Sequence, residues 1–186
     1  MTGGETPAAG VFLDTGTLGE DVDLTELGRT LPRWEYHAAT RPDETAARIA
    51  GAEVVVTNKV VLDAAALAAA PRLRLVCVAA TGTDNVDLEA ARHRGIAVCN
   101  VPGYSNSAVP QMVFAMLLAL YSRVPEYHRA VCEGRWSRSP HFCLLDYPIH
   151  ELDGTVLGIL GYGALGREVE RLAQAFGLRN VIGSHP

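Results

Sequence analysis

The sequence lacks the features that mark several broad protein classes. No stretch of 18 apolar residues is free of charge, and the N-terminus has no basic region followed by an apolar core. We therefore expect no transmembrane helix, no signal peptide and no association with a membrane. The net charge is −5 and the basic residues form no patch, so nucleic acid is not an expected partner.

Cysteine is sparse and carries no metal-binding or redox signature. The four cysteines have no C-x-x-C spacing, and the six histidines are scattered without ligand spacing. Cys77 and Cys99 lie in strand-like apolar runs, where a thiol behaves as a small hydrophobe; the other two are Cys132 and Cys143. No metal site is expected, and a reduced, cytoplasmic protein is the simplest interpretation.

What is present is an ordinary globular composition, 48% hydrophobic and 20% charged, whose first hundred residues alternate strand and helix patterns. Such alternation predicts a parallel sheet with helices on both faces, and five strands suit a flavodoxin-like arrangement. The predicted strands are 11–14, 34–37, 53–58, 73–80 and 96–100. The predicted helices are 24–31, 43–50, 62–70 and 88–94.

A boundary follows at Pro102-Gly103, and a long apolar helix is predicted from Ala108 to about Arg123. Ser107 is a suitable N-cap, which places Pro110 in the first turn, where its missing N–H is harmless. An irregular stretch with Trp136, Phe142 and Tyr147 is expected over 128–149. It is either an arm that packs on a partner or a loop folded over its own domain.

The most informative segment is Gly161-Tyr162-Gly163-Ala164-Leu165-Gly166. An apolar run, 155–160, precedes it and predicts a buried strand, and helical spacing follows it to Phe176. A G-x-G-x-x-G run at a strand-to-helix turn is the fingerprint of a dinucleotide-binding site, with the pyrophosphate at the helix N-terminus. A Rossmann domain needs about six strands, and only 181–184 follows here, so the domain is expected to be incomplete.

Two further turns follow predicted strands and could meet a substrate. The turn Ala79–Asp87 contains Thr81-Gly82, whose backbone N–H groups could hold a carboxylate, or it is a plain turn capped by Asp87. Lys59, after Thr57-Asn58, could meet an anionic substrate or be solvated surface.

Several blocks, in this order, resemble the D-isomer-specific 2-hydroxyacid dehydrogenases, and among them the glycerate dehydrogenase (hydroxypyruvate reductase) branch. The resemblance covers nearly the whole chain and is weakest near the N-terminus. The blocks are Val55–Leu62, Ala79–Asp87, Gly95–Tyr104, Gly134–Ser137 and Leu157–Gly166.

The resemblance implies a flavodoxin-like substrate domain, 1–101, followed by 102–186 with a dimerisation helix, an arm and the start of a Rossmann NAD(P)-binding domain. It implies hydride transfer between NAD or NADP and a 2-oxo or 2-hydroxy acid such as hydroxypyruvate or glyoxylate, in a homodimer. The substrate-binding residues implied are Asn58, Lys59, Thr81 and Gly82. The cofactor-binding residues implied are Gly161, Tyr162, Gly163, Ala164, Leu165, Gly166 and Ser184.

Three departures from the family pattern qualify this prediction. The family's catalytic Arg, Glu and His fall after the glycines, and His141, His150 and His185 do not match, so no catalytic residue is assigned. Ser184 stands where an acidic residue would bind the ribose 2′-OH, which permits NADP as well as NAD. Pro110 and Met112 stand where the family usually has a small residue and a His.

These departures leave two classes of function open. The chain is either part of an oxidoreductase, truncated here and inactive alone, or a ligand-binding, regulatory or corepressor-like module without turnover. Coding sequence for the missing Arg, Glu and His beyond codon 186 would favour the first.

Overall fold

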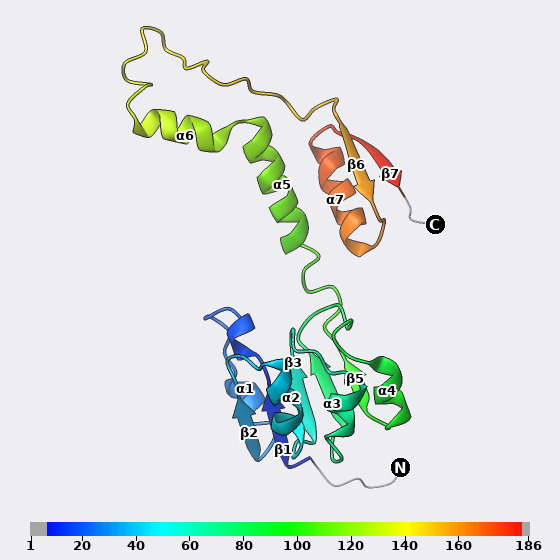
Figure 1. Ribbon diagram of the computed structural model, residues 1–186. Coiled ribbons are helices and arrows are strands. Elements are labelled where there is room, and N and C mark those ends of the chain that lie inside the picture. The colour runs from blue at the N-terminus through cyan, green and yellow to red at the C-terminus, as the bar shows by residue number, and fades with distance from the viewer. Residues whose placement is uncertain (1–6, 184–186) are drawn as a thin grey trace. The chain divides into compact units, whose positions relative to one another are not determined.

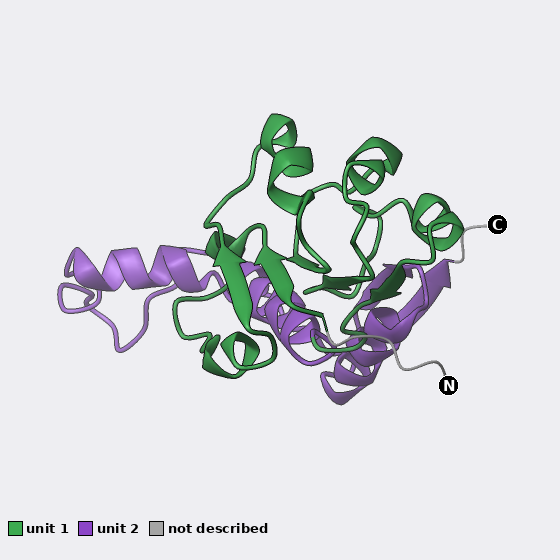
Figure 2. Cartoon of the chain, turned by 90° about the horizontal axis from the view of Figure 1, so that it is seen from below, with its two compact units in different colours: residues 1–104 green, residues 105–186 purple. Residues whose placement is uncertain are grey.

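A computed structural model describes residues 7–183. The chain divides into two compact units, Met1–Tyr104 and Ser105–Pro186, which Figure 2 shows in different colours. The first unit contains the larger hydrophobic core, and the second contains the glycine-rich turn.

The first unit is built on a five-stranded parallel sheet with the order β2-β1-β3-β4-β5 (Figure 1). This order confirms the predicted flavodoxin-like arrangement. Its reversal lies between β1 and β3, and ligands of such sheets bind outside the carboxyl ends of the strands near that point. The strands are β1 (Ala9–Phe12), β2 (Arg33–Tyr36), β3 (Val54–Thr57), β4 (Leu75–Val78) and β5 (Ala97–Cys99).

Short helices connect these strands, and their first turns are fixed by side chains. Asp63 accepts a hydrogen bond from the Ala66 N–H at 2.8 Å, and Asp87 accepts one from the Ala90 N–H at 2.9 Å. Such N-caps each contribute about 1 kcal/mol. The connections are the 3₁₀ turn Thr15–Thr17 and the helices α1 (Thr25–Gly28), α2 (Pro42–Ile49), α3 (Ala64–Ala68) and α4 (Leu88–His93).

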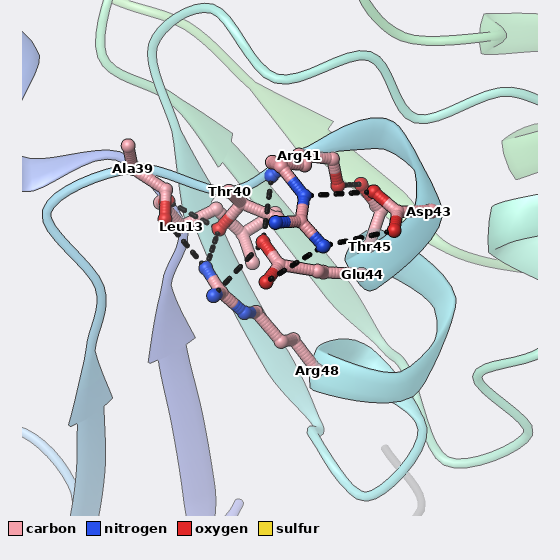
Figure 3. A network of polar contacts seen from close by, with 8 residues as sticks. All are labelled: Leu13, Ala39, Thr40, Arg41, Asp43, Glu44, Thr45 and Arg48. Atoms are coloured by element: carbon pink, nitrogen blue, oxygen red, sulfur yellow. Dashed lines mark hydrogen bonds and ion pairs between the residues drawn. The ribbon is translucent and has the colours of Figure 1, made fainter.

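A polar network fixes the start of α2 (Figure 3). Arg48 donates to the Ala39 carbonyl at 2.6 Å and to the Thr40 hydroxyl at 2.5 Å, and it pairs with Glu44 at 3.0 Å. The Thr40 hydroxyl donates to the Leu13 carbonyl at 2.5 Å. The loop after β2 is therefore tied both to α2 and to the end of β1.

The core of the first unit lies between the sheet and its helices. The apolar residues of the central strands are buried because the connecting helices pack against the sheet. The largest fully buried side chains include Leu13, Ile49, Val55, Leu62, Leu67 and Val76.

The second unit begins with two helices, α5 (Ala108–Tyr121) and α6 (Val124–Cys132). The predicted start at Ala108 and the place of Pro110 in the first turn are confirmed, although the Ser107 side chain makes no capping bond. In the described residues, no single helix is long and apolar enough to cross a membrane. The helices α5 and α6 reach that length and hydropathy when taken together, across a 58° bend.

A small β-α-β unit completes the second unit. It consists of β6 (Val156–Leu160), α7 (Ala164–Ala175) and β7 (Arg179–Gly183), with β6 and β7 parallel. A core formed by Phe114, Leu152, Ala173 and Leu178 packs α5 against α7 and the flanking strands. The predicted strand–glycine turn–helix order is thus confirmed.

Two sequence expectations for this unit were wrong. The stretch 128–149 was expected to be irregular, but α6 continues to Cys132 because the chain restarts helically at Val124-Pro125 after Arg123 adopts a left-handed conformation, with φ at +54°. The strand before the glycines was expected to be buried, but in β6 only Ile159 is buried and Leu160 is 82% exposed. Within the described residues β6 pairs with one strand, β7, and this leaves most of its surface open.

The arm after α6 is held to its own unit at one point and is exposed at another. Tyr147 is held to α6, since the Tyr127 hydroxyl donates to its carbonyl at 2.8 Å and the two rings meet edge to face. Phe142, by contrast, is 96% exposed and touches Trp136 edge to face.

Candidate functional site

The two predicted substrate turns lie side by side at the carboxyl edge of the parallel sheet. One turn, 57–60, follows β3, and the other, 81–83, follows the neighbouring strand β4. The Ala79 N–H donates to the Thr57 carbonyl at 2.8 Å, and the Asn85 side-chain amide donates to the Val60 carbonyl at 3.1 Å. Asn58, Lys59, Thr81 and Gly82 are therefore brought to one edge.

The 81–83 turn presents open backbone donors. In the described part of the chain, the N–H groups of Thr81, Gly82 and Thr83 have no hydrogen-bond acceptor. The turn is held from behind, since the Thr81 hydroxyl donates to the Val101 carbonyl at 3.0 Å and the Asn100 amide donates to the Thr81 carbonyl at 2.7 Å. Successive free N–H groups in a fixed turn favour an anion such as a carboxylate. The cap that Asp87 gives α4 is present as well, so the two interpretations of this turn are compatible.

The 57–60 turn differs, because its donors are already occupied. The Asp14 carboxylate accepts from the N–H groups of Asn58 at 2.9 Å, Lys59 at 2.6 Å and Val60 at 3.2 Å. Asp14 is 3% exposed. Sequence reasoning missed this residue; the signal was an acidic residue two positions after the apolar strand β1.

The side chains of the 57–60 turn have different surroundings. The Asn58 amide donates to the Thr17 hydroxyl at 3.0 Å. No hydrogen bond or ion pair of the Lys59 ammonium occurs within residues 7–183. Lys59 is thus the free cation that this turn offers to an anionic ligand.

A pocket of about 700 Å³ opens beside Lys59, near the point where the strand order reverses between β1 and β3. Its walls come from the segments after β1, β2 and β3 and from α2 and α3, and they include Asp14, Thr40 and Val60. Of the four predicted substrate residues, Lys59 lines this pocket, whereas Asn58, Thr81 and Gly82 do not.

The glycines between β6 and α7 meet three different steric demands. Gly161 has φ at +88°, which favours glycine. A Cβ on Gly163 would meet no atom within 4 Å, so the space in front of this backbone is open. A Cβ on Gly166 would lie 2.5 Å from the Gly161 carbonyl oxygen, so only glycine allows α7 to start this close to β6.

The N-terminus of α7 is open to a ligand. Gly163 is the N-cap residue, and no side chain in the described chain caps the helix. The N–H groups and the positive dipole end of a helix start of this kind suit a phosphate group. The backbone of Gly163, Ala164, Leu165 and Gly166 forms this start, whereas Ser184, the predicted ribose-binding residue, lies outside the described residues.

Tyr162 and its neighbours hold the outer side of the turn. The Tyr162 hydroxyl donates to the Glu170 carboxylate, and this bond raises the pKa of Tyr162. Arg167 donates to the Tyr162 carbonyl at 3.2 Å. The Tyr162 phenol is thereby drawn toward α7.

The cysteines give no indication of a metal centre. Cys77 and Cys99 are register partners on β4 and β5, and burial raises the pKa of the Cys77 thiol. Across the part of the chain that the structure describes, no group of three or more His, Cys, Asp or Glu side chains could hold a metal ion.

Comparison with known proteins gives a consistent picture. Residues 14–174 match the model of the D-isomer specific 2-hydroxyacid dehydrogenase catalytic domain. The chain is 40% identical over 169 residues to a glycerate dehydrogenase of Methylorubrum extorquens, covering 91% of this chain and 53% of that protein. It is 39% identical over 156 residues to a hydroxypyruvate reductase of Blautia hydrogenotrophica, covering 84% and 48%. The chain thus spans about half the length of these curated relatives.

Solved structures show the same likeness. A protein from Thermus thermophilus superposes with a TM-score of 0.76 and 31% identity, over 96% of this chain and 56% of that one. A D-lactate dehydrogenase from Aquifex aeolicus, solved with NAD and lactic acid, superposes with a TM-score of 0.73 and 25% identity, over 94% and 50%.

Proposed function

The chain belongs to the family of D-isomer-specific 2-hydroxyacid dehydrogenases. On this premise we propose that it is part of an NAD(P)-dependent oxidoreductase. The reaction would transfer hydride between the nicotinamide and a small 2-oxo acid of the hydroxypyruvate or glyoxylate kind. The relatives named glycerate dehydrogenase and hydroxypyruvate reductase support this substrate class.

The observation that carries the proposal is the glycine turn between β6 and α7. Gly161 has the positive φ of a tight turn, the space before Gly163 is open, and Gly166 lets α7 approach β6. These are the three demands of a turn that receives a pyrophosphate at a helix N-terminus. The residues Gly161 to Gly166 would hold the cofactor, which supplies or accepts the hydride when bound. Ser184, which has no carboxylate to repel a 2′-phosphate, would allow either NAD or NADP.

The substrate carboxylate would bind to the 81–83 turn. The unpaired N–H groups of Thr81 and Gly82 support this assignment. Lys59, a free cation at the same sheet edge, and Asn58 would supply further polar contacts. In this assignment residues 1–101 form the substrate domain and 102–186 the start of the cofactor domain.

We also propose that residues 1–186 bind substrate and cofactor without catalysing the reaction. None of its residues matches the family's catalytic Arg, Glu or His, and general acid–base catalysis alone supplies roughly 10²–10⁴-fold in rate. Mixed with hydroxypyruvate and NADH or NADPH, the purified chain should show no cofactor oxidation above background.

The substrate assignment is tested by titrating the ¹⁵N-labelled chain with hydroxypyruvate. The amide resonances of Thr81, Gly82 and Thr83 should shift in a saturable way, because the carboxylate would accept from these N–H groups. Dihydroxyacetone, which has a hydroxymethyl group in place of the carboxylate, is the matched control and should leave them unchanged. Equal shifts with both compounds, or none with hydroxypyruvate, would refute the assignment.

A further inference from the structure

We propose that Asp14 is a positioning residue that fills one anion-binding turn of this sheet edge and thereby leaves the neighbouring turn, 81–83, as the backbone cradle for the substrate carboxylate. The proposal rests on the proposed function for the role of the 81–83 turn. Its core, an internal carboxylate that occupies a preformed anion site, rests on the geometry of Asp14 alone.

The contacts of Asp14 resemble those of a bound anion. Its Oδ2 accepts from the N–H groups of Asn58 at 3.0 Å, Lys59 at 2.6 Å and Val60 at 3.2 Å. The Thr57 hydroxyl approaches the same oxygen at 3.4 Å, and Oδ1 takes a second contact from the Asn58 N–H at 2.9 Å. Three successive N–H groups converging on one oxygen form a nest for a negative charge.

These contacts are not those of a helix cap. Asp63 and Asp87 each accept from one N–H three residues further along the chain. Asp14 follows β1, and it accepts from backbone N–H groups that lie 44 to 46 positions away in the turn after the neighbouring strand β3. It is also buried, and a buried carboxylate is costly unless several donors satisfy it. This position therefore favours a carboxylate, whose negative charge and two acceptor oxygens match the converging N–H groups.

Filling this nest matters because the two turns are alike in chemistry and adjacent in space. Both turns follow neighbouring strands, and the Ala79 to Thr57 hydrogen bond joins their starts. An empty 57–60 turn would present its own N–H groups to any carboxylate that approaches this edge. With Asp14 in place, those N–H groups are occupied, and the turn offers a ligand only side chains, chiefly the Lys59 ammonium.

The test is chemical rescue of Asp14→Ala with formate, a carboxylate small enough to replace the deleted group. In the ¹⁵N-labelled variant, added formate should shift the amide resonances of Asn58, Lys59 and Val60 and raise the melting temperature. Hydroxypyruvate should shift the same three amides, because the vacated N–H groups can donate to any small carboxylate.

Asp63→Ala is the matched control, since it removes a capping carboxylate of similar kind from the same sheet edge. It should be destabilised, yet formate should neither shift the amides of residues 58–60 nor restore stability. An Asp14→Ala variant that responds to formate no more than Asp63→Ala does would overturn the proposal, because Asp14 would then act only through packing.

A measurement on the parent chain keeps the proposal testable even where Asp14→Ala does not fold. Formate should leave the amides of residues 58–60 unchanged in the parent, because Asp14 already holds them. Saturable shifts at these amides would contradict the proposal. Failure of hydroxypyruvate to bind the 81–83 turn would refute the proposed function, whereas the formate response at residues 58–60 tests Asp14 independently.

Discussion

At the scale of single residues, the glycine turn between β6 and α7 combines positions that differ in their tolerance of an added side chain. The open space before Gly163 and the crowded space at Gly166 lie only three residues apart. The spacing of the G-x-G-x-x-G fingerprint accounts for both roles, since its second glycine faces the pyrophosphate and its third lets the helix pack closely on the strand. The role of Asp14 could not be predicted in this way, since its partners lie more than 40 residues away and only the fold brings them together.

Gly166→Ala is expected to destabilise the second unit. Its Cβ would lie 2.5 Å from the Gly161 carbonyl oxygen, a backbone atom that cannot rotate away. Overpacking of this kind costs about 1–3 kcal/mol. Gly163→Ala is the control and should unfold like the parent, because no atom lies within 4 Å of its added methyl group. Urea unfolding compares the three proteins, and equal midpoints for both variants would contradict this steric account.

At the scale of elements, local patterns predicted the first unit better than the second. Each strand of the first sheet was predicted within a few residues. The buried strands β1 and β3 were predictable because such strands appear as short apolar runs between turn residues. The burial of β6 could not be predicted this way, since burial depends on neighbouring strands and β7 is the one strand that the described residues place beside it. The extent of α6 was missed because the break at Arg123 depends on one left-handed residue.

The break between α5 and α6 gives an element-scale prediction. Arg123 has φ at +54°, a conformation that costs a residue with a Cβ about 1–2 kcal/mol and costs glycine almost nothing. Arg123→Gly should therefore be more stable than Arg123→Ala by about 1 kcal/mol. Both variants lose the ion pair with Glu126, so the comparison isolates the backbone. Chemical denaturation measures the difference, and a more stable alanine variant would show that the backbone is not left-handed in solution.

At the scale of the whole molecule, exposed apolar surface on the second unit is consistent with the homodimer that the family resemblance implies. Met112, Met116 and Leu120 of α5 are all more than half exposed, and Phe142 of the arm is almost fully exposed. Surfaces of this kind favour pairing with another chain.

The chain should therefore self-associate in a concentration-dependent way, as light scattering at several concentrations would show. Met116→Glu combined with Leu120→Glu should shift the population toward monomer, because a charge buried in an interface is costly. Glu168→Gln, a change at a partly exposed position on α7, should leave association unchanged. A parent chain that stays monomeric at every concentration would refute the dimer assignment.

The central claim is that the turn from Gly161 to Gly166 receives a dinucleotide, and calorimetric titration with NADH tests it most directly. The parent should bind weakly and Gly163→Val should not bind, because the branched side chain would fill the space that the pyrophosphate needs. Gly158→Val, the same substitution in the middle of β6 where an added Cβ also meets no atom within 4 Å, should bind like the parent. Equal NADH affinity for the parent and Gly163→Val would contradict the account.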